Sequence, residues 1–150
     1  MLKSVNISWT KTKKNVEQII SQYIYYSLSV DNSSSSNIGD SYFLDALDFN
    51  SVDKTYIKIS QEEQKRRIDF VNYVRFSFNK LTTEERKIIY WTYLDKENNY
   101  DDRFIANNLG FSLGYYYIKK KETLIRFAYS LGVEELNDKW GLNKSSFYMI

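Results

Sequence analysis

The feature that most constrains this chain is that almost nothing in its sequence interrupts a helix. Its 150 residues include no proline and only five glycines, the two residue types that break helices most effectively. Helix ends must therefore be marked by capping residues and by polar clusters, such as the Asn/Ser-rich run over residues 31–37. Apolar residues recur three and four positions apart in several segments, which is the helical period. We predict an all-α protein with no strand longer than a few residues.

Capping residues divide the chain into helices. Ser60 with Glu63, and Thr82 with Glu85, have the spacing of a capping box, in which each side chain accepts a bond from a free backbone amide. Asn99 is assigned as the cap of a later helix. Residues 42–59 show no clean period and are expected to be mostly irregular. The expected helices span residues 15–28, 60–80, 82–94, 99–109 and 112–131.

The 60–80 helix carries apolar residues on more than one side. One face is formed by five residues at helical spacing, Ile68, Val71, Val74, Phe78 and Leu81. Phe70, Tyr73 and Phe76 fall partly off that face. A helix that is apolar on two sides is usually buried between neighbours, which is the arrangement that we expect here; the alternative is a contact with another protein.

Composition excludes several classes of function. The chain contains neither cysteine nor histidine, so disulfides, thiolate chemistry and the commonest general base and metal ligand are absent. The carboxylates, lysines, serines and tyrosines that remain show no catalytic motif. No apolar run approaches the roughly 18 residues of a membrane helix, and no signal-peptide core is visible. We expect a cytoplasmic protein that is not an enzyme and has no cofactor, no metal and no membrane partner.

The spacing of Ala106, Gly110 and Tyr116 predicts a helix-turn-helix between about Asn99 and Leu131. Two helices that cross closely need a small residue in the first helix, and the tight turn four residues later needs a glycine with positive φ. An apolar side chain six residues further on then fills the space between the helices; Tyr116 is assigned this position, and Tyr117, one residue later, is the alternative. Leu124 and Phe127 complete the predicted core. The alternative is a purely structural helical hairpin.

The rotation of the second helix assigns its faces. The buried stripe is expected to hold Tyr116, the stem of Lys120, Thr123, Leu124 and Phe127. Residues 112–131 carry four basic side chains against one acidic, which favours DNA over a solvated face. Leu113 and Ile118 are expected at thymine methyls, Tyr117 and Lys121 at bases or phosphates, and the Ser112 amide at a phosphate. The candidate DNA-binding residues are Ser112, Leu113, Gly114, Tyr115, Tyr117, Ile118, Lys119 and Lys121.

Several blocks of sequence resemble the ArpU/RinA-type phage late-transcription regulators. They are Ile-Tyr-Trp-Thr-Tyr-Leu-Asp-Lys at 89–96, Ile-Ala-x-x-Leu-Gly-Phe-Ser at 105–112, the pairs 116–117 and 120–121, and Leu-x-Arg-Phe-Ala-x-x-Leu-Gly at 124–132, with a weaker block over 12–23. This C-terminal half is also similar to region 4 of bacterial sigma factors, which reads promoter DNA and binds RNA polymerase. The resemblance implies an activator of phage late genes for packaging, assembly or lysis. Tyr115 and Ile118 depart from the family pattern, so the operator cannot be transferred.

The resemblance and the helical pattern together suggest three regions. Residues 1–80 form an N-terminal helical part with a Ser/Asn-rich loop near 31–58, residues 81–133 form the sigma-region-4-like helix-turn-helix, and residues 134–150 form an apolar tail that packs back or meets a partner. The expected partner is double-stranded DNA of a late promoter in a bacterial host cell. Host RNA polymerase, a protein partner or inhibitor, and a second copy are left open. The alternative function is a sigma-like adaptor that binds RNA polymerase or another regulator without reading DNA.

Overall fold

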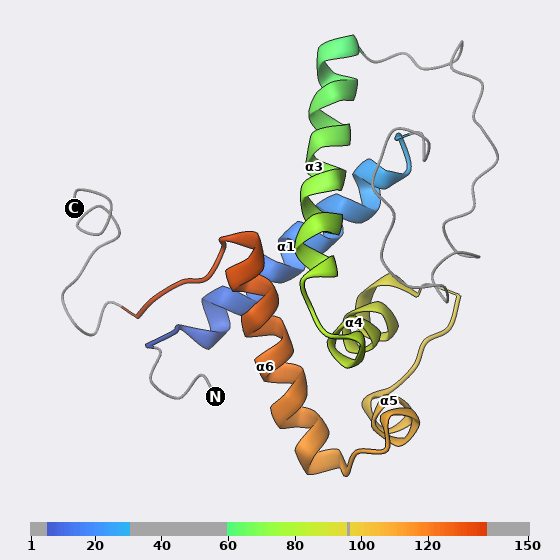
Figure 1. Ribbon diagram of the computed structural model, residues 1–150, viewed down its shortest axis with the longest axis vertical. Coiled ribbons are helices and arrows are strands. Elements are labelled where there is room, and N and C mark those ends of the chain that lie inside the picture. The colour runs from blue at the N-terminus through green and yellow to red at the C-terminus, as the bar shows by residue number, and fades with distance from the viewer. Residues whose placement is uncertain (1–5, 31–59, 96, 138–150) are drawn as a thin grey trace.

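The computed structural model describes residues 6–30, 60–95 and 97–137 (Figure 1). Every regular element within these ranges is a helix, and the only extended pairing is an isolated bridge between Ile7 and Leu136. The predicted all-α fold is confirmed. The expectations for residues 31–59 and for the tail from residue 138 lie outside the described residues. The elements are α1 (Trp9–Ser27), α3 (Gln61–Asn79), α4 (Thr83–Ile89), the π-helical η4 (Tyr90–Leu94), α5 (Asp102–Leu109) and α6 (Leu113–Leu131).

Helix α1 begins at Trp9, so the start predicted at residue 15 is wrong. Its N-cap, Ser8, makes no side-chain capping bond. The beginning of the helix is instead held by residues from the far end of the chain. The Ser8 amide donates to the Glu135 carbonyl at 2.8 Å, and the Glu135 amide donates to Thr12 Oγ1 at 3.1 Å. This start depends on a contact between distant parts of the sequence, which local spacing cannot reveal.

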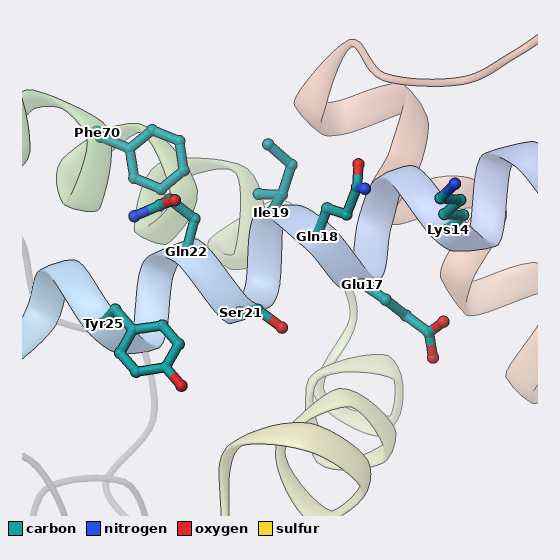
Figure 2. Close-up of a pocket in the computed structure, with 8 residues that line it drawn as sticks. All are labelled: Lys14, Glu17, Gln18, Ile19, Ser21, Gln22, Tyr25 and Phe70. Carbon is teal, nitrogen blue, oxygen red and sulfur yellow. The ribbon is translucent and has the colours of Figure 1, made fainter.

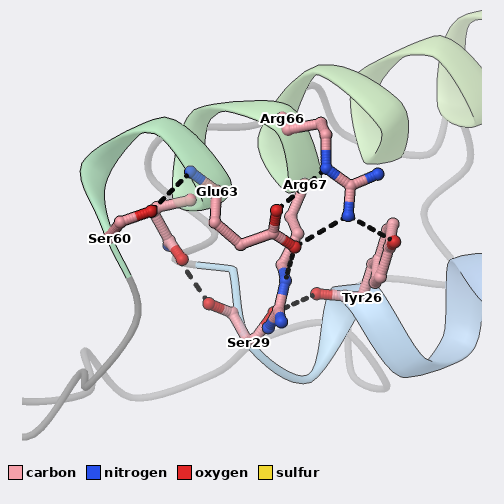
Figure 3. A network of polar contacts seen from close by, with 7 residues as sticks. Tyr26, Ser29, Ser60, Glu63, Arg66 and Arg67 are labelled. Atoms are coloured by element: carbon pink, nitrogen blue, oxygen red, sulfur yellow. Dashed lines mark hydrogen bonds and ion pairs between the residues drawn. The ribbon is translucent and has the colours of Figure 1, made fainter.

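The two predicted capping boxes differ in the structure. At Thr82 and Glu85 both reciprocal bonds are present, and that prediction is confirmed. At α3 only half of the box forms: the Glu63 amide donates to Ser60 Oγ at 3.1 Å, while the Glu63 carboxylate accepts from Arg66 and Arg67 (Figure 3). These two guanidinium groups lower the pKa of Glu63 to about 2. Because Arg66 and Arg67 bind the Glu63 carboxylate, it does not accept from the Ser60 amide, and the second bond of the box is missing.

Helix α5 is capped by Asp101, so the assignment of Asn99 as its cap is wrong. Asp101 Oδ1 accepts from the Phe104 amide at 2.8 Å. The preceding residue, Tyr100, stacks on the Phe104 ring with centroids 4.2 Å apart, and it packs against the apolar cluster that contains Ile105. A hydrophobic residue before the cap that packs onto the first turns fixes where a helix begins. Tyr100 therefore has to stay outside the helix, which places the cap at the next residue.

The main core is formed where α1, α3 and α6 cross. Its members include Val16, Ile20, Val74, Phe127 and Leu131. Of the predicted apolar face of α3, four residues are buried and only Ile68 is half-buried. The expected burial of α3 on a second side is wrong for Tyr73, which is 40% exposed, and for Phe76, which is 63% exposed. Phe70 is half-buried, packs on the main core and contacts the Tyr26 ring of α1.

A buried carboxylate joins α4 to α6. Glu85 has 1% of its side chain exposed; one oxygen accepts from the Thr82 amide at 2.9 Å and the other lies 2.8 Å from Arg126 Nε. Arg126 is 51% exposed. The charge that needs its partner is therefore the carboxylate, because the guanidinium can be hydrated on its own.

We expect Arg126→Ala to lower the free energy of unfolding by about 3 kcal/mol, since it leaves a buried carboxylate unpaired. Glu85→Gln should lower it by about 1 kcal/mol, because the amide oxygen still caps the helix and Arg126 turns to water. Urea unfolding followed by circular dichroism measures both values. In the variant carrying both changes the loss should be smaller than in Arg126→Ala alone. A double variant that loses more would show that the pair is not coupled in this way.

Candidate nucleic-acid interface

Helices α5 and α6 are joined by a turn of three residues. Gly110 adopts φ 73°, the left-handed conformation that favours glycine, and the Phe111 amide donates to the Ala106 carbonyl at 2.9 Å. Ser112 then caps α6, with its Oγ accepting from the Tyr115 amide at 3.2 Å. Both helix ends at the turn thus satisfy their backbone groups locally, which fixes the angle at which α6 leaves α5.

Tyr116 anchors α6 to α5. Its side chain is fully buried, whereas that of Tyr117 is 50% exposed, so Tyr116 is the residue that fills the space between the two helices. Tyr116 packs with Ile105 and Ala106 in a small cluster that is separate from the main core. Partly buried apolar side chains surround this cluster, namely Trp91, Tyr100, Leu109, Phe111 and Leu113.

Asp102 ties the first turn of α5 to α6 through two groups. Its Oδ1 accepts from the Tyr116 hydroxyl at 3.2 Å and lies 3.0 Å from Lys120 Nζ. Burial, with a further contribution from the Asp102 charge, raises the pKa of Tyr116, so this hydroxyl stays protonated and remains a donor. Lys120 was expected to contribute only its aliphatic stem to the buried stripe. Its ammonium is also engaged, and its charge is directed at α5 rather than at a partner.

The two ends of α6 pack in different places. Leu124 and Phe127, expected to join Ala106 and Tyr116 in one core, are buried in the main core with α1 and α3 instead. Helix α5 has eight residues, about 12 Å at 1.5 Å per residue, and reaches only the first turns of α6. Figure 1 shows α5 and the N-terminal half of α6 lying away from α1 and α3.

The outer face of the first turns of α6 is exposed. Tyr115, Tyr117 and Ile118 have half or more of their surface accessible. Ser112, Gly114 and Lys121 are exposed as well, while Lys119 is half-buried. Leu113 is also half-buried and packs on the Tyr116 cluster, so it does not project freely from this face as expected. The structure therefore leaves most of the candidate DNA-binding residues exposed at the N-terminal half of α6.

Four cations near this surface differ in their surroundings. Arg126 and Lys120 are neutralised by Glu85 and Asp102, so the positive charge predicted for residues 112–131 is smaller in effect than its formal value. Lys121 Nζ lies 5.3 Å from the centre of the Trp9 ring on α1, a cation–π distance that leaves the ammonium exposed to solvent. Arg103, exposed on α5, was not identified from the sequence. Its position one residue after Asp102 in the first turn of α5 is the only signal that could have suggested it.

Outside this surface, the described chain has an open cleft but neither a metal-binding cluster nor a membrane-spanning helix. Within residues 6–30, 60–95 and 97–137, no group of acidic side chains could hold a metal ion, and no helix is long and apolar enough to cross a membrane. An open cleft follows α1 and is lined by residues that include Lys14, Glu17 and Tyr25 (Figure 2). Figure 2 shows the polar side chains of this cleft pointing in different directions from α1 rather than toward one point.

Comparisons with protein-family models, with curated proteins and with solved structures found no match to this chain. The resemblance to phage late-transcription regulators therefore stays a prediction from sequence. Any assignment of function has to come from the geometry of α5 and α6.

We expect Gly110→Val to lower the free energy of unfolding by about 1–3 kcal/mol because valine is strained at positive φ. No atom lies within 4 Å of the position that a Cβ would occupy at Gly110 or at Gly114, so collisions do not contribute. Gly114→Ala is the matched control. Gly114 is helical, and alanine there should raise stability by up to about 1 kcal/mol. Thermal unfolding of the two variants measures the contrast; equal effects would mean that the turn at Gly110 is not strained by a side chain.

Proposed function

We propose that this chain is a sequence-specific, DNA-binding transcriptional regulator whose α5 and α6 act as a helix-turn-helix. The observation that carries the proposal is the contrast over the first two turns of α6: Tyr116 is fully buried against α5, while Tyr115, Tyr117 and Ile118 face outward. In a helix-turn-helix the second helix lies in the major groove with its first turns at the base edges. A helix anchored on one side and exposed on the other side at its N-terminal end meets that requirement.

The side chains on this face suit the two kinds of contact that DNA offers. Ile118 would meet thymine methyl groups, and the Tyr117 hydroxyl would bond to a base edge or a phosphate. Lys119 and Lys121 would contact phosphates. Gly114 has open space where a Cβ would stand, so the backbone of α6 could approach the duplex closely there. In the wider proposal, which draws on the sequence resemblance, the target is a phage late promoter and host RNA polymerase is a second partner.

A second candidate function is a sigma-like adaptor that binds a protein and does not read DNA. The observation in its favour is that the exposed face is more aromatic than basic, since Lys120 and Arg126 are already paired with carboxylates. Phosphate contacts supply most of the non-specific affinity for DNA, and exposed aromatic side chains are typical of protein interfaces. The two candidates differ in whether Lys121 and Tyr117 affect DNA binding.

We expect Lys121→Ala to weaken binding to all duplex sequences and to reduce the slope of log K against log salt by about 0.9, the release of one counterion. Tyr117→Ala should weaken binding to the cognate site by about 1–3 kcal/mol more than binding to random DNA, as a base-edge contact does. The cognate site is obtained by selection from a pool of random duplexes. Fluorescence anisotropy at several salt concentrations then gives both quantities.

Exposed residues of the same types, far from this face, provide the matched controls. Lys65→Ala on α3 and Tyr25→Ala on α1 should leave DNA binding unchanged, because both side chains are exposed on other elements. Phe127→Ala should lower the free energy of unfolding by about 3–5 kcal/mol. It is the control for a loss of DNA binding that is caused by unfolding. If Lys121→Ala and Tyr117→Ala bind as tightly as the parent at every salt concentration, this face does not contact DNA. The adaptor is then the better candidate.

A further inference from the structure

Helix α3 carries a continuous exposed stripe on the side that faces away from the core. Its six residues are spaced alternately four and three positions apart, the spacing of the contact seam between two paired helices. All six are exposed, with Phe76 at 63% and Tyr73 at 40%. We call them the α3 stripe: Glu62, Arg66, Asp69, Tyr73, Phe76 and Lys80. In Figure 1 the N-terminal end of α3 extends beyond the other described helices, and the contacts of the stripe with α1 there are those of Arg66 with Tyr26.

The α3 stripe is complementary to itself when two copies run antiparallel. With the twofold axis crossing the stripe at the height of Val71 along α3, Glu62 lies opposite Lys80 of the partner copy, which makes an ion pair. Arg66 lies opposite the partner copy's Phe76, which makes a cation–π contact, and Asp69 lies opposite the partner copy's Tyr73, where a hydroxyl meets a carboxylate. Symmetry repeats each of these contacts. We propose that α3 is a dimerisation surface and that its partner is a second copy of this chain, bound antiparallel in this register.

Residues of the α3 stripe make contacts within one chain that contacts with the partner copy could replace. The Arg66 guanidinium donates to Glu63 and to the Tyr26 hydroxyl (Figure 3), yet its side chain is 59% exposed. The Arg66 guanidinium already lies over the Tyr26 ring of its own chain, 5.4 Å from the ring centre, so the partner's ring would have to stack on the opposite face, which hydrogen bonds in the plane leave open. Lys80 Nζ lies 4.7 Å from the centre of the Phe76 ring in the same chain. In the dimer this ammonium would move to the partner's Glu62, and the partner's Arg66 would take its place on the ring.

Charge also decides against the parallel arrangement. In a parallel pair in register, each residue of the α3 stripe would face its own copy, which sets Glu62 against Glu62, Asp69 against Asp69 and Lys80 against Lys80. Like charges directly opposite each other disfavour an interface. The antiparallel register instead brings every charged or aromatic group to a group that attracts it. The inference goes beyond the proposed function and does not rest on it, since association is measured without DNA.

Charge reversal at the two ends of the stripe tests the proposal. Sedimentation equilibrium of the full chain should show a monomer–dimer equilibrium. Glu62→Lys and Lys80→Glu should each weaken the dimer by about tenfold, because symmetry places each change in the interface twice. An equimolar mixture of these two variants should regain dimerisation, since every end pair is then of opposite charge. Lys11→Glu, an exposed site on α1, is the control and should leave association unchanged, and circular dichroism checks that each variant is folded.

Disulfide formation tests the register. The chain contains no cysteine, so an introduced pair reports only on the designed contact. A mixture of Asp69→Cys and Tyr73→Cys chains should oxidise mainly to the mixed dimer, whereas a parallel pair would link chains that carry the same substitution. Mainly homodimeric products would overturn the register. A parent chain that stays monomeric at every concentration, or a dimer that both charge reversals leave intact, would overturn the proposal as a whole.

Discussion

The packing of α6 into two separate apolar clusters is the constraint on which the rest of the structure depends. Its C-terminal half contributes Leu124 and Phe127 to the main core, and its N-terminal half contributes Tyr116 to the small cluster with α5. These residues share one stripe of a continuous helix, so the main core sets the rotation of the whole of α6. The outward direction of Tyr117 and Ile118 is therefore determined by contacts several turns away from them.

Two carboxylates control the charge of α6. Asp102 accepts from Tyr116 and pairs with Lys120, while the buried Glu85 pairs with Arg126. Both contacts join α6 to helices that precede it, and both use lysine or arginine groups that would otherwise add to a basic surface. The same ion pairs that position α6 thus leave its outer face with aromatic side chains and few free cations. Any partner of this face must match shape and apolar surface as well as charge.

Local signals in the sequence were sufficient for much of the fold. The Thr82–Glu85 box and the positive φ of Gly110 each depend on residues within one turn, and the structure has both of them. Three features were mispredicted because they depend on tertiary contacts. The start of α1 depends on residues 134–137, and the cap at Asp101 depends on the stacking of Tyr100. The exposed second side of α3 depends on how few helices surround it.

The candidate site shows the same limit of prediction. The spacing of the apolar residues of α6 limits the buried position to Tyr116 or Tyr117, and the structure buries Tyr116 and exposes Tyr117. The half-burial of Leu113 and the pairing of Lys120 could not be predicted, since both depend on how α5 lies against α6. Periodicity thus gives the face of a helix, and tertiary contacts decide which side chains on that face remain available.

The π-helical turn of η4 has a consequence for how this sequence could change. Its wider turn, closed by the Asp95 amide on the Tyr90 carbonyl at 2.8 Å, lets neighbouring residues serve different clusters: Tyr90 packs on the main core and Trp91 on the small one. A π turn holds about one residue more than an α turn. Deleting one residue here would restore a regular helix, and because the wide turn already completes the full rotation of an α turn, the residues after it would keep nearly the same direction. The effect of such a deletion would therefore be local, since adjacent residues could no longer pack on the two clusters separately.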